Sequence, residues 1–275
     1  VLFRSAHETP GGTRHLRQAV LTTVNDLLRR GLKELGLERA QLVSAVLAGN
    51  TAMIHLLLGL PANQLRLEPY IPVATAPPPL PAREVGLFAL SEAPVYFVPG
   101  VASFVGGDIT AGIVAAGVDR SPRLTLFLDI GTNGEMVLGN ADWLLACVCS
   151  AGPAFEGVGL EAGVRAMRGA VDRVHWDPET GWRYHTIGNQ PAVGICGSGL
   201  IDLIAALRRA GVIDRSGRMH READPDRVRQ GKEGWEFVLV PAAASATGRD
   251  LVITEGDVRN LLRSKAAVYA GLQVM

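Results

Sequence analysis

The chain alternates between helical hydrophobic spacing and short apolar runs of the kind that form buried strands. Apolar residues recur every three or four positions over Thr13–Leu35, with Arg and Lys between them, and Gly36 follows. This spacing predicts an amphipathic helix that ends at the glycine. A short apolar run at Val43–Ala48 and renewed helical spacing over Ala52–Leu58 predict a strand, a polar loop and a helix in that order.

Proline dominates the next stretch of the chain. Pro61–Pro81 is rich in proline, which removes backbone donors and fixes φ, so we expect neither a regular helix nor a central strand there. A surface excursion or a flap is expected instead. Beyond it, Val95–Val98 is predicted to be a strand and Asp108–Ala116 a helix of small residues.

The second half of the chain begins after a polar break at Asp119–Arg123. The apolar run Thr125–Ile130 predicts a strand, and Gly131-Thr132-Asn133-Gly134 has the composition of a hairpin turn. Further strands are predicted at Glu135–Leu138, Trp143–Val148, Ala170–Trp176 and Trp182–Ile187. We therefore place a boundary at the polar break, with a first lobe at 1–122 and a second lobe at 123–275.

Two helices are predicted toward the end of the chain. One covers Leu200–Arg209 and opens at Gly197-Ser198-Gly199, and the last begins at Thr254 and Asp257, which have the spacing of a capping box. Between them, the charged segment Arg215–Gly234 is expected to be a mobile surface insertion.

Composition narrows the classes of function. The 27 basic residues balance the 27 acidic ones, which leaves no net field to attract nucleic acid or an anionic membrane. Gly and Pro interrupt the longest apolar stretches, so none of them is expected to span a bilayer. Cys147, Cys149 and Cys196 are expected to be buried small hydrophobic side chains in a reducing, cytoplasmic compartment. The six histidines lack metal-ligand spacing.

The strongest chemical signal lies where the strand Thr125–Ile130 ends. The strand delivers Asp129 to its end, and a glycine-rich turn follows at once. Gly131 and Gly134 let backbone N–H groups approach a phosphate, and Thr132 adds a hydroxyl donor. Asp129 is placed to orient Mg²⁺ through water. An ordinary tight hairpin has the same spacing, so both interpretations stay open at this point.

Two polar positions in the first lobe are candidates for the same chemistry. Asp108 follows Gly106-Gly107 at the start of a helix, where it is either a helix cap or a functional carboxylate. Asn50 and Thr51 follow a predicted strand, and they either face a cleft or form an ordinary polar junction before a helix.

The second lobe carries two more glycine-rich loops. Gly152 lies at a strand end, and Glu156 in the same loop would position a ribose or Mg²⁺, or merely cap a turn. Gly197-Ser198-Gly199 opens a helix whose N-terminal N–H groups can receive an anion. Loops of this kind in both lobes predict a nucleotide cleft between them.

Six segments, in consistent order over nearly the whole chain, resemble those of the reductive activators of corrinoid proteins: Ala48–Met53, Val105–Ile109, Leu128–Met136, Ala151–Gly157, Gly194–Asp202 and Ile253–Arg259. The resemblance implies an α/β fold of the actin-like ATPase type, in the superfamily of acetate and sugar kinases, Hsp70 and actin. Two ribonuclease-H-like lobes, each present in part, are expected.

The resemblance also implies ATP and Mg²⁺ as cofactors. The matching nucleotide- and phosphate-binding residues are Asp129, Gly131, Thr132, Asn133, Gly134, Glu135, Gly152, Glu156, Gly197, Ser198 and Gly199. Asp129 is the residue that would hold Mg²⁺ through water. In related sugar kinases, the Asp that matches Asp108 is the catalytic base.

A protein of this family would couple ATP hydrolysis to transfer of an electron from an iron–sulfur domain to a Co(II) corrinoid. Its partner would be the corrinoid protein of a methyltransferase system, and the resemblance also allows a homodimer. Complete members usually begin with a plant-type [2Fe–2S] domain, whose C-x₄-C-x₂-C pattern does not occur here. The first phosphate loop is expected before Val1 and the adenosine-binding segment after Met275, so the chain is interpreted as a fragment truncated at both ends and inactive alone.

Two alternatives stay open. A small-molecule kinase of the same superfamily would use Asp108 to accept a hydroxyl proton, although Pro61–Pro81 shows no sugar-binding cluster of Asn, Asp and Trp. The other alternative is a non-catalytic scaffold that docks a corrinoid protein.

Overall fold

The computed structural model describes residues 11–89, 91–232 and 234–275. These residues form two compact units, and each is described by itself. Unit 1 comprises the described residues up to Phe127 together with Val137–Ala146, and unit 2 comprises Leu128–Met136 and Cys147–Met275. Within the described ranges, none of the helices combines the length and the apolar character needed to cross a bilayer.

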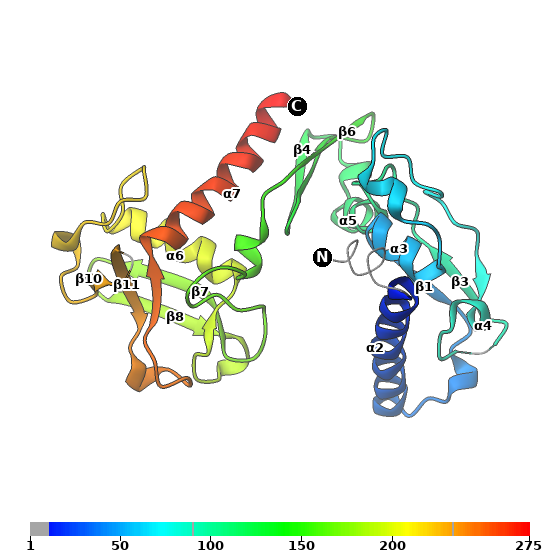
Figure 1. The fold of residues 1–275 in the computed structure, drawn as a ribbon, viewed down its shortest axis with the longest axis horizontal. Helices are drawn as coiled ribbons and strands as arrows, with labels where there is room; N and C mark the ends of the chain where they lie inside the picture. The colour runs from blue at the N-terminus through cyan, green and yellow to red at the C-terminus, as the bar shows by residue number, and fades with distance from the viewer. Residues whose placement is uncertain (1–10, 90, 233) are drawn as a thin grey trace. The chain divides into compact units, whose positions relative to one another are not determined.

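The first helix of unit 1, α2 (Gly12–Leu35), ends at a glycine as the sequence predicts (Figure 1). Gly36 adopts the left-handed conformation, with φ of 67°, which costs glycine little because it has no Cβ. The N–H of Leu37 then donates to the carbonyl oxygen of Leu32 at 2.8 Å and satisfies one of the last free carbonyls of the helix. The predicted helix and its C-terminal end are confirmed.

The sheet of unit 1 has β3 (Pro94–Phe97) at its centre, with β1 (Ala45–Leu47) parallel to it and β2 (Leu80–Pro81) antiparallel. Helices α3 (Thr51–Leu58) and α4 (Ala82–Val85) complete this part. Its core is formed by apolar side chains of α2, α3, α4, the sheet and the adjoining loop: Leu21, Ile54, Leu57, Ala82, Val85, Leu87, Ala89, Ala93, Val95 and Phe97.

The proline-rich stretch between α3 and β3 is irregular, as predicted, apart from a short 3₁₀ helix and the edge strand β2. The buried ring of His55 anchors it to α3, because Nδ1 lies 2.7 Å from the carbonyl oxygen of Thr51 and Nε2 accepts from the N–H of Val73 at 3.1 Å. Both ring nitrogens therefore have structural partners.

A helix and a second sheet follow. Helix α5 (Gly107–Ala116) precedes the sheet of β4 (Thr125–Ile130), β5 (Gly134–Gly139) and β6 (Leu144–Cys149), in the order β4-β5-β6. The ends of β4 are those that the sequence predicts, and those of β5 and β6 differ from the prediction by one residue.

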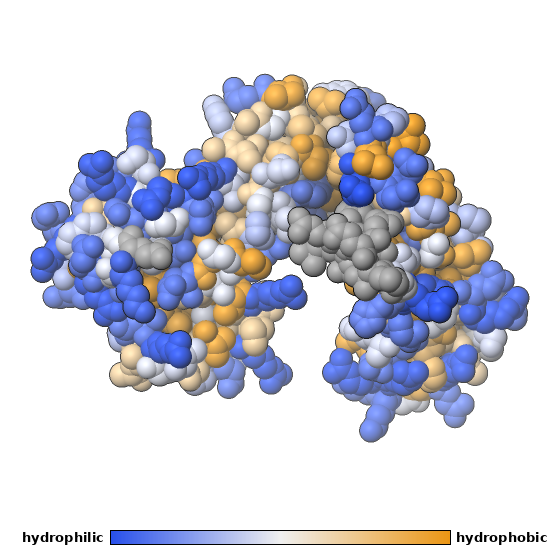
Figure 2. Space-filling model, viewed as in Figure 1, coloured by the Kyte–Doolittle hydropathy of each residue, from blue (hydrophilic) through white to orange (hydrophobic). Residues whose placement is uncertain are grey.

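One face of β4 is apolar and open to solvent. Leu126, Leu128 and Ile130 alternate along the strand and remain 41%, 39% and 38% exposed. Hydrophobic surface is accordingly visible over β4 and β6 in Figure 2.

Unit 2 contains a sheet with β7 (Ala170–Asp177) at its centre, β8 (Gly181–Thr186) antiparallel to it and β9 (Gly194–Ile195) parallel to it. Helix α6 (Gly197–Arg209) packs on β7. Short 3₁₀ helices connect elements of both units at Arg39–Gln41, Asn63–Arg66, Val118–Arg120, Pro153–Glu156, Ile187–Asn189, Arg221–Ala223 and Ala242–Ala244.

The expectation of a mobile surface insertion at Arg215–Gly234 is wrong. This segment supplies β10 (Val228–Gly231), the first strand of an antiparallel sheet with β11 (Gly234–Val240) and β12 (Leu251–Thr254). Its Met219 and Val228 are buried in the core of unit 2. The charge of the segment misled the prediction, since the guanidinium of Arg229 is paired within the unit, at 2.8 Å from both Glu236 and Asp250.

The last helix, α7 (Glu255–Val274), begins at the predicted capping box. The hydroxyl of Thr254 accepts from the N–H of Asp257, and the carboxylate of Asp257 accepts from the N–H of Thr254, both at 3.0 Å. The core of unit 2 joins α6, α7 and the two sheets through Val171, Val174, Ile195, Leu200, Leu203, Leu207, Phe237, Leu239, Ile253, Val258 and Leu261, among others.

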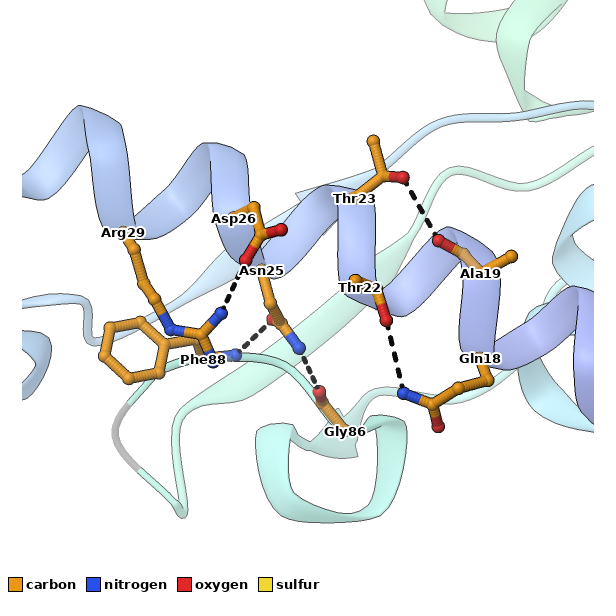
Figure 3. A network of polar contacts seen from close by, with 9 residues as sticks. All are labelled: Gln18, Ala19, Thr22, Thr23, Asn25, Asp26, Arg29, Gly86 and Phe88. Carbon is orange, nitrogen blue, oxygen red and sulfur yellow. Dashed lines mark hydrogen bonds and ion pairs between the residues drawn. The ribbon is translucent and has the colours of Figure 1, made fainter.

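A polar contact holds α2 against the loop after α4 (Figure 3). Asn25 accepts from the N–H of Phe88 at 2.6 Å and donates to the carbonyl oxygen of Gly86 at 2.9 Å. The guanidinium of Arg29 lies over the Phe88 ring, 4.6 Å from its centre. One amide thus satisfies two backbone groups that lie more than 60 positions further along the chain.

We expect Asn25→Ala to lower the free energy of unfolding by about 1–3 kcal/mol, because two hydrogen bonds to the backbone are lost. The matched control is Gln18→Ala on the same helix, whose side chain only donates to the exposed hydroxyl of Thr22. Its effect should stay within about 0.5 kcal/mol. Urea denaturation followed by circular dichroism measures both, and equal stabilities of the two variants would contradict the anchoring role.

Candidate functional site

The predicted phosphate loop lies in unit 2, in the turn between β4 and β5. The N–H of Gly131 donates to the carbonyl oxygen of Asn133 at 2.8 Å and closes the turn. The carbonyl oxygen of Thr132 accepts from the N–H of Gly152 at 2.8 Å, which joins this turn to the loop after β6. Asp129, Thr132 and Asn133 are exposed, and Glu135 is half-buried on β5.

Glu156 occupies the donors of Thr132. Its Oε2 accepts from the hydroxyl of Thr132 at 2.8 Å, and its Oε1 accepts from the N–H of the same residue at 3.2 Å. The hydroxyl of Thr132, which the sequence assigns to a phosphate, and the N–H of the same residue therefore both face a carboxylate. This arrangement favours a cation at the loop, or an anion that arrives with one, over a free anion.

The N-terminus of α6 reaches the same segment. A Cβ at Gly197 would lie 2.0 Å from the carbonyl oxygen of Phe155, so only glycine allows this approach. A depression of about 410 Å³ is lined there by Phe155, Glu156, Val164, Arg165, Ala166, Cys196, Gly197 and Ser198. Four predicted residues, Gly152, Glu156, Gly197 and Ser198, thus lie close to the turn at Thr132 or to one another.

Two of the predicted glycines have packing reasons of their own. A Cβ at Gly199 would lie 2.2 Å from the carbonyl oxygen of Val171, which seats α6 on β7. A Cβ at Gly134 would lie 2.8 Å from Sγ of Cys149. The structure accounts for both glycines without a ligand.

A larger apolar groove in unit 2 begins at the same place and was not predicted. Its volume is about 700 Å³, and it is lined by Ile130, Phe155, Ile201, Ile204, Ala205, Arg208, Ile213, Asp214, Arg215, Leu261, Leu262, Lys265 and Val268. Phe155 lines both this groove and the depression at Gly197. The sequence signal is the spacing of Ile201, Ala205 and Arg208 along α6, but a core-facing stripe has the same spacing.

The rim of the groove carries both signs of charge. Arg208, Arg215 and Lys265 contribute three cations. Hydrogen bonds from the hydroxyl of Ser216 and from the backbone N–H groups of Arg218 and Ser216 lower the pKa of Asp214 to about 2, so its carboxylate is ionised at neutral pH. Cations outnumber anions at this rim.

Helix α7 ties the groove to the loop before Gly152. The hydroxyl of Ser264, which is 3% exposed, donates to the carbonyl oxygen of Ala151 at 2.5 Å. Because Ala151 and Gly152 are neighbours, α7 and the turn at Thr132 are held by consecutive residues of one loop.

The remaining predicted residues form a cluster within unit 1. The carboxylate of Asp108 accepts from the N–H of Ile109 at 3.0 Å, and the N–H of Asp108 donates to the carbonyl oxygen of Gly49 at 3.3 Å. Asn50 caps α3 by accepting from the N–H of Met53 at 2.9 Å. The buried hydroxyl of Thr51 donates to the carbonyl oxygen of Ala102 at 2.9 Å. Asn50 and Thr51 therefore have structural functions, and Asp108 is half-buried at the first turn of α5.

The prediction that all three cysteines are buried is confirmed for Cys196 only. Cys147 and Cys149 are half-buried and pack with Met136 and Val268. Burial raises the pKa of the Cys149 thiol, which keeps it protonated at neutral pH. Among the described residues, no group of three or more His, Cys, Asp or Glu side chains could hold a metal ion.

Comparison with known proteins identifies relatives of the whole chain. A family model described as the C-terminal domain of RACo, the ASKHA domain, matches residues 123–275, and one described as the RACo middle region matches residues 1–121. The corrinoid activation enzyme RamQ of Eubacterium limosum is 33% identical over 274 residues, which cover 97% of this chain and 46% of RamQ.

Two further relatives agree. The "[Co(II) methylated amine-specific corrinoid protein] reductase" of Methanosarcina barkeri is 27% identical over 213 residues, which cover 69% of this chain and 35% of that protein. A solved structure, "Reductive activator for corrinoid,iron-sulfur protein", superposes with a TM-score of 0.88 at 51% identity, covering 99% of this chain and 44% of that one. This chain spans less than half the length of each of these three proteins.

Proposed function

This chain belongs to the RACo family, and we propose that it forms the nucleotide-handling part of an ATP-driven reductive activator of a corrinoid protein. Its C-terminal region is an ASKHA domain, the actin-like ATPase fold that the sequence predicts, and this domain suggests ATP binding. In the proposed reaction, ATP hydrolysis drives the transfer of one electron from an iron–sulfur domain to a Co(II) corrinoid. The nucleotide contributes by favouring one arrangement of the protein, since it shifts an equilibrium only through differential affinity.

The observation that carries the proposal is the convergence of three loops at Glu156. The turn at Thr132, the 3₁₀ helix that bears Glu156 and the N-terminus of α6 supply hydroxyl and N–H donors within one small region of unit 2. Backbone donors and a helix N-terminus are the groups that cradle phosphates. We place the phosphates of ATP at Gly131, Thr132, Asn133, Gly152, Gly197 and Ser198, with Gly134 and Gly199 holding the turn and α6 in place beside them.

The apolar groove beside these loops suits the rest of the nucleotide. Its walls are aliphatic side chains of α6 and α7, and a purine ring buries well between such surfaces. Arg208, Arg215 and Lys265 at the rim would offset phosphate charge. We propose that part of the adenosine packs against this groove, together with the adenosine-binding segment of the complete protein, because Phe155 lines the groove as well as the depression at Gly197.

We propose that Mg²⁺ binds with the phosphates beside the carboxylate of Glu156. A phosphate at Thr132 would lie next to the charge of Glu156, and a divalent cation shared between the two removes that repulsion. Glu156 and Asp129 would supply carboxylate oxygens, and Mg²⁺ prefers one or two carboxylates with water and phosphate oxygens. When bound, the ion would neutralise charge on the phosphates.

The remaining features of the proposal concern the complete protein. The electron donor would be a [2Fe–2S] domain, and the partner the corrinoid protein of a methyltransferase system in the cytoplasm. Lobes at 1–122 and 123–275 and a homodimeric state belong to the same proposal. Support comes from the relatives, two of which are named as an activator or reductase of corrinoid proteins and one as an activator of a corrinoid iron–sulfur protein.

Glu156→Gln in the full-length protein should change how ATP affinity depends on Mg²⁺. Without metal, removing the negative charge beside Thr132 should tighten ATP binding about fivefold to tenfold, because a like charge near the phosphates is gone. With Mg²⁺, the lost ligand should weaken binding. Calorimetry gives the ATP affinity in Mg²⁺ and in chelator, and the ratio of the two affinities is compared between variants. The control is Glu179→Gln, which removes the same charge at the exposed β7–β8 turn. If Glu156→Gln and Glu179→Gln give the same ratio, Glu156 is not part of the site.

Asp108→Asn should preserve ATP binding while hydrolysis and corrinoid activation fall together. Asn can still accept from the N–H of Ile109, so the start of α5 is kept, but it cannot take a proton from water. Loss of a general base costs about 10²–10⁴-fold in rate. The measurement is ATP turnover with and without the corrinoid protein, with the exposed Asp142→Asn as control. Turnover within a few-fold of the parent would leave Asp108 as a helix-start residue only.

A further inference from the structure

The β7–β8 hairpin of unit 2 carries a face of basic side chains, which we call the basic face: Arg173, His175, Arg183 and His185. The strand register places Arg173 opposite His185 and His175 opposite Arg183. Since side chains alternate along a strand, these four share one face. The opposite face carries Val174, which is 5% exposed and belongs to the core of unit 2.

Few groups within the unit compensate this face. Asp172 lies against His185, with its Oδ1 2.6 Å from Nδ1 of the imidazole. Arg183 donates only to the hydroxyl of Thr180, at 2.8 Å. The side chains of Arg173 and His175 make no hydrogen bond or ion pair with any residue that the structure describes.

A third arginine extends the basic face. Arg209, in the last turn of α6, lines the same shallow depression of about 600 Å³ as the hairpin side chains, and its guanidinium likewise has no partner among the described residues. The one acidic side chain in the lining, Asp202, is engaged by the N–H of Val174 at 3.2 Å. Three arginines and two histidines thus converge on one depression.

The chemistry of this depression suits carboxylates on the surface of another protein. All five basic side chains are exposed, so the depression meets a protruding surface rather than enclosing a small molecule. Arginine binds carboxylates in a planar, two-bond geometry. The balanced total of 27 basic and 27 acidic residues provides no wider field of the kind that holds a nucleic acid.

We propose that the basic face and Arg209 dock an acidic surface of the corrinoid protein, an assignment that rests on the proposed function. Docking there would give carboxylate partners to Arg173 and Arg209, whose guanidinium groups have none among the described residues. The contact lies on β7, β8 and Arg209, whereas the proposed phosphate residues lie at the N-terminal end of α6 and Arg208 lines the adjoining groove. Partner recognition and nucleotide binding would therefore share α6 but use different side chains of it.

The test compares charge reversals in the full-length protein. Arg173→Glu with Arg183→Glu changes the basic face, and Arg221→Glu with Arg263→Glu makes the same change in net charge at exposed positions elsewhere in unit 2. Arg209→Glu, on α6, probes the surface without altering the hairpin. Association with the purified corrinoid protein is followed by biolayer interferometry at ~50 mM and ~300 mM salt, a range over which screening of exposed charges grows strongly.

We expect the basic-face pair and Arg209→Glu to weaken binding about tenfold or more at low salt, mainly through the association rate, and to reduce the salt dependence. The control pair should stay within about twofold of the parent, and ATP affinity should be unchanged in all variants. Equal binding by basic-face and control variants, with the parent binding normally, would overturn the docking surface and leave the proposed function standing. A parent that fails to bind the corrinoid protein at all would overturn both.

Discussion

The contact between Glu156 and Thr132 is the constraint on which the candidate site depends. It places a carboxylate against a hydroxyl and an N–H of the turn that ends β4, at 2.8 and 3.2 Å. Residues near Glu156 in the sequence extend the site. The N–H of Gly152 donates to the carbonyl oxygen of Thr132, and the carbonyl oxygen of Phe155 packs against Gly197 at the start of α6. Without this contact, the turn at Thr132 would be an isolated hairpin, and Glu156 would not join it to the start of α6 and the adjoining groove.

The same contact underlies our proposal that a phosphate binds here together with a cation. Donors that face phosphate in a simple anion site are here already satisfied by a negatively charged group, so a phosphate must displace it or share a cation with it. The rim of the adjoining groove likewise places a carboxylate beside cations. Asp214 stays ionised because its own loop donates to it, and three cations surround the same opening. These charges support our proposal that the site takes a metal–nucleotide complex, a ligand that carries charge of both signs.

Much of the local structure could be predicted from the sequence because local physics determines it. Gly36 and the capping box of Thr254 and Asp257 set helix ends through their own backbone geometry and hydrogen bonds. The strand Thr125–Ile130 follows from an unbroken apolar run. Asn50 illustrates the limit: its sequence position allows a cleft residue or an ordinary polar junction before a helix, and the 2.9 Å hydrogen bond that it accepts from the N–H of Met53 is seen only in the structure.

What sequence reasoning missed depends on distant partners. β10 lies in a charged segment, and it is held by pairing with β11, by the buried side chain of Val228 and by the ion pairs of Arg229 with Glu236 and Asp250. The groove between α6 and α7 was missed because a stripe of apolar residues looks the same whether it faces a core or a ligand. The resemblance to corrinoid-protein activators supplied the family, whereas the pairing of Glu156 with Thr132 required the three-dimensional arrangement.

Hydrogen exchange of the full-length protein, with and without MgATP, tests the central claim most directly, since amides slow their exchange when a ligand closes over them. We predict slower exchange in the peptides that contain Thr132, Gly152–Glu156 and the first turn of α6, together with the groove-lining part of α7. Slower exchange confined to other parts of the protein, with these four segments unchanged at saturating nucleotide, would contradict the account.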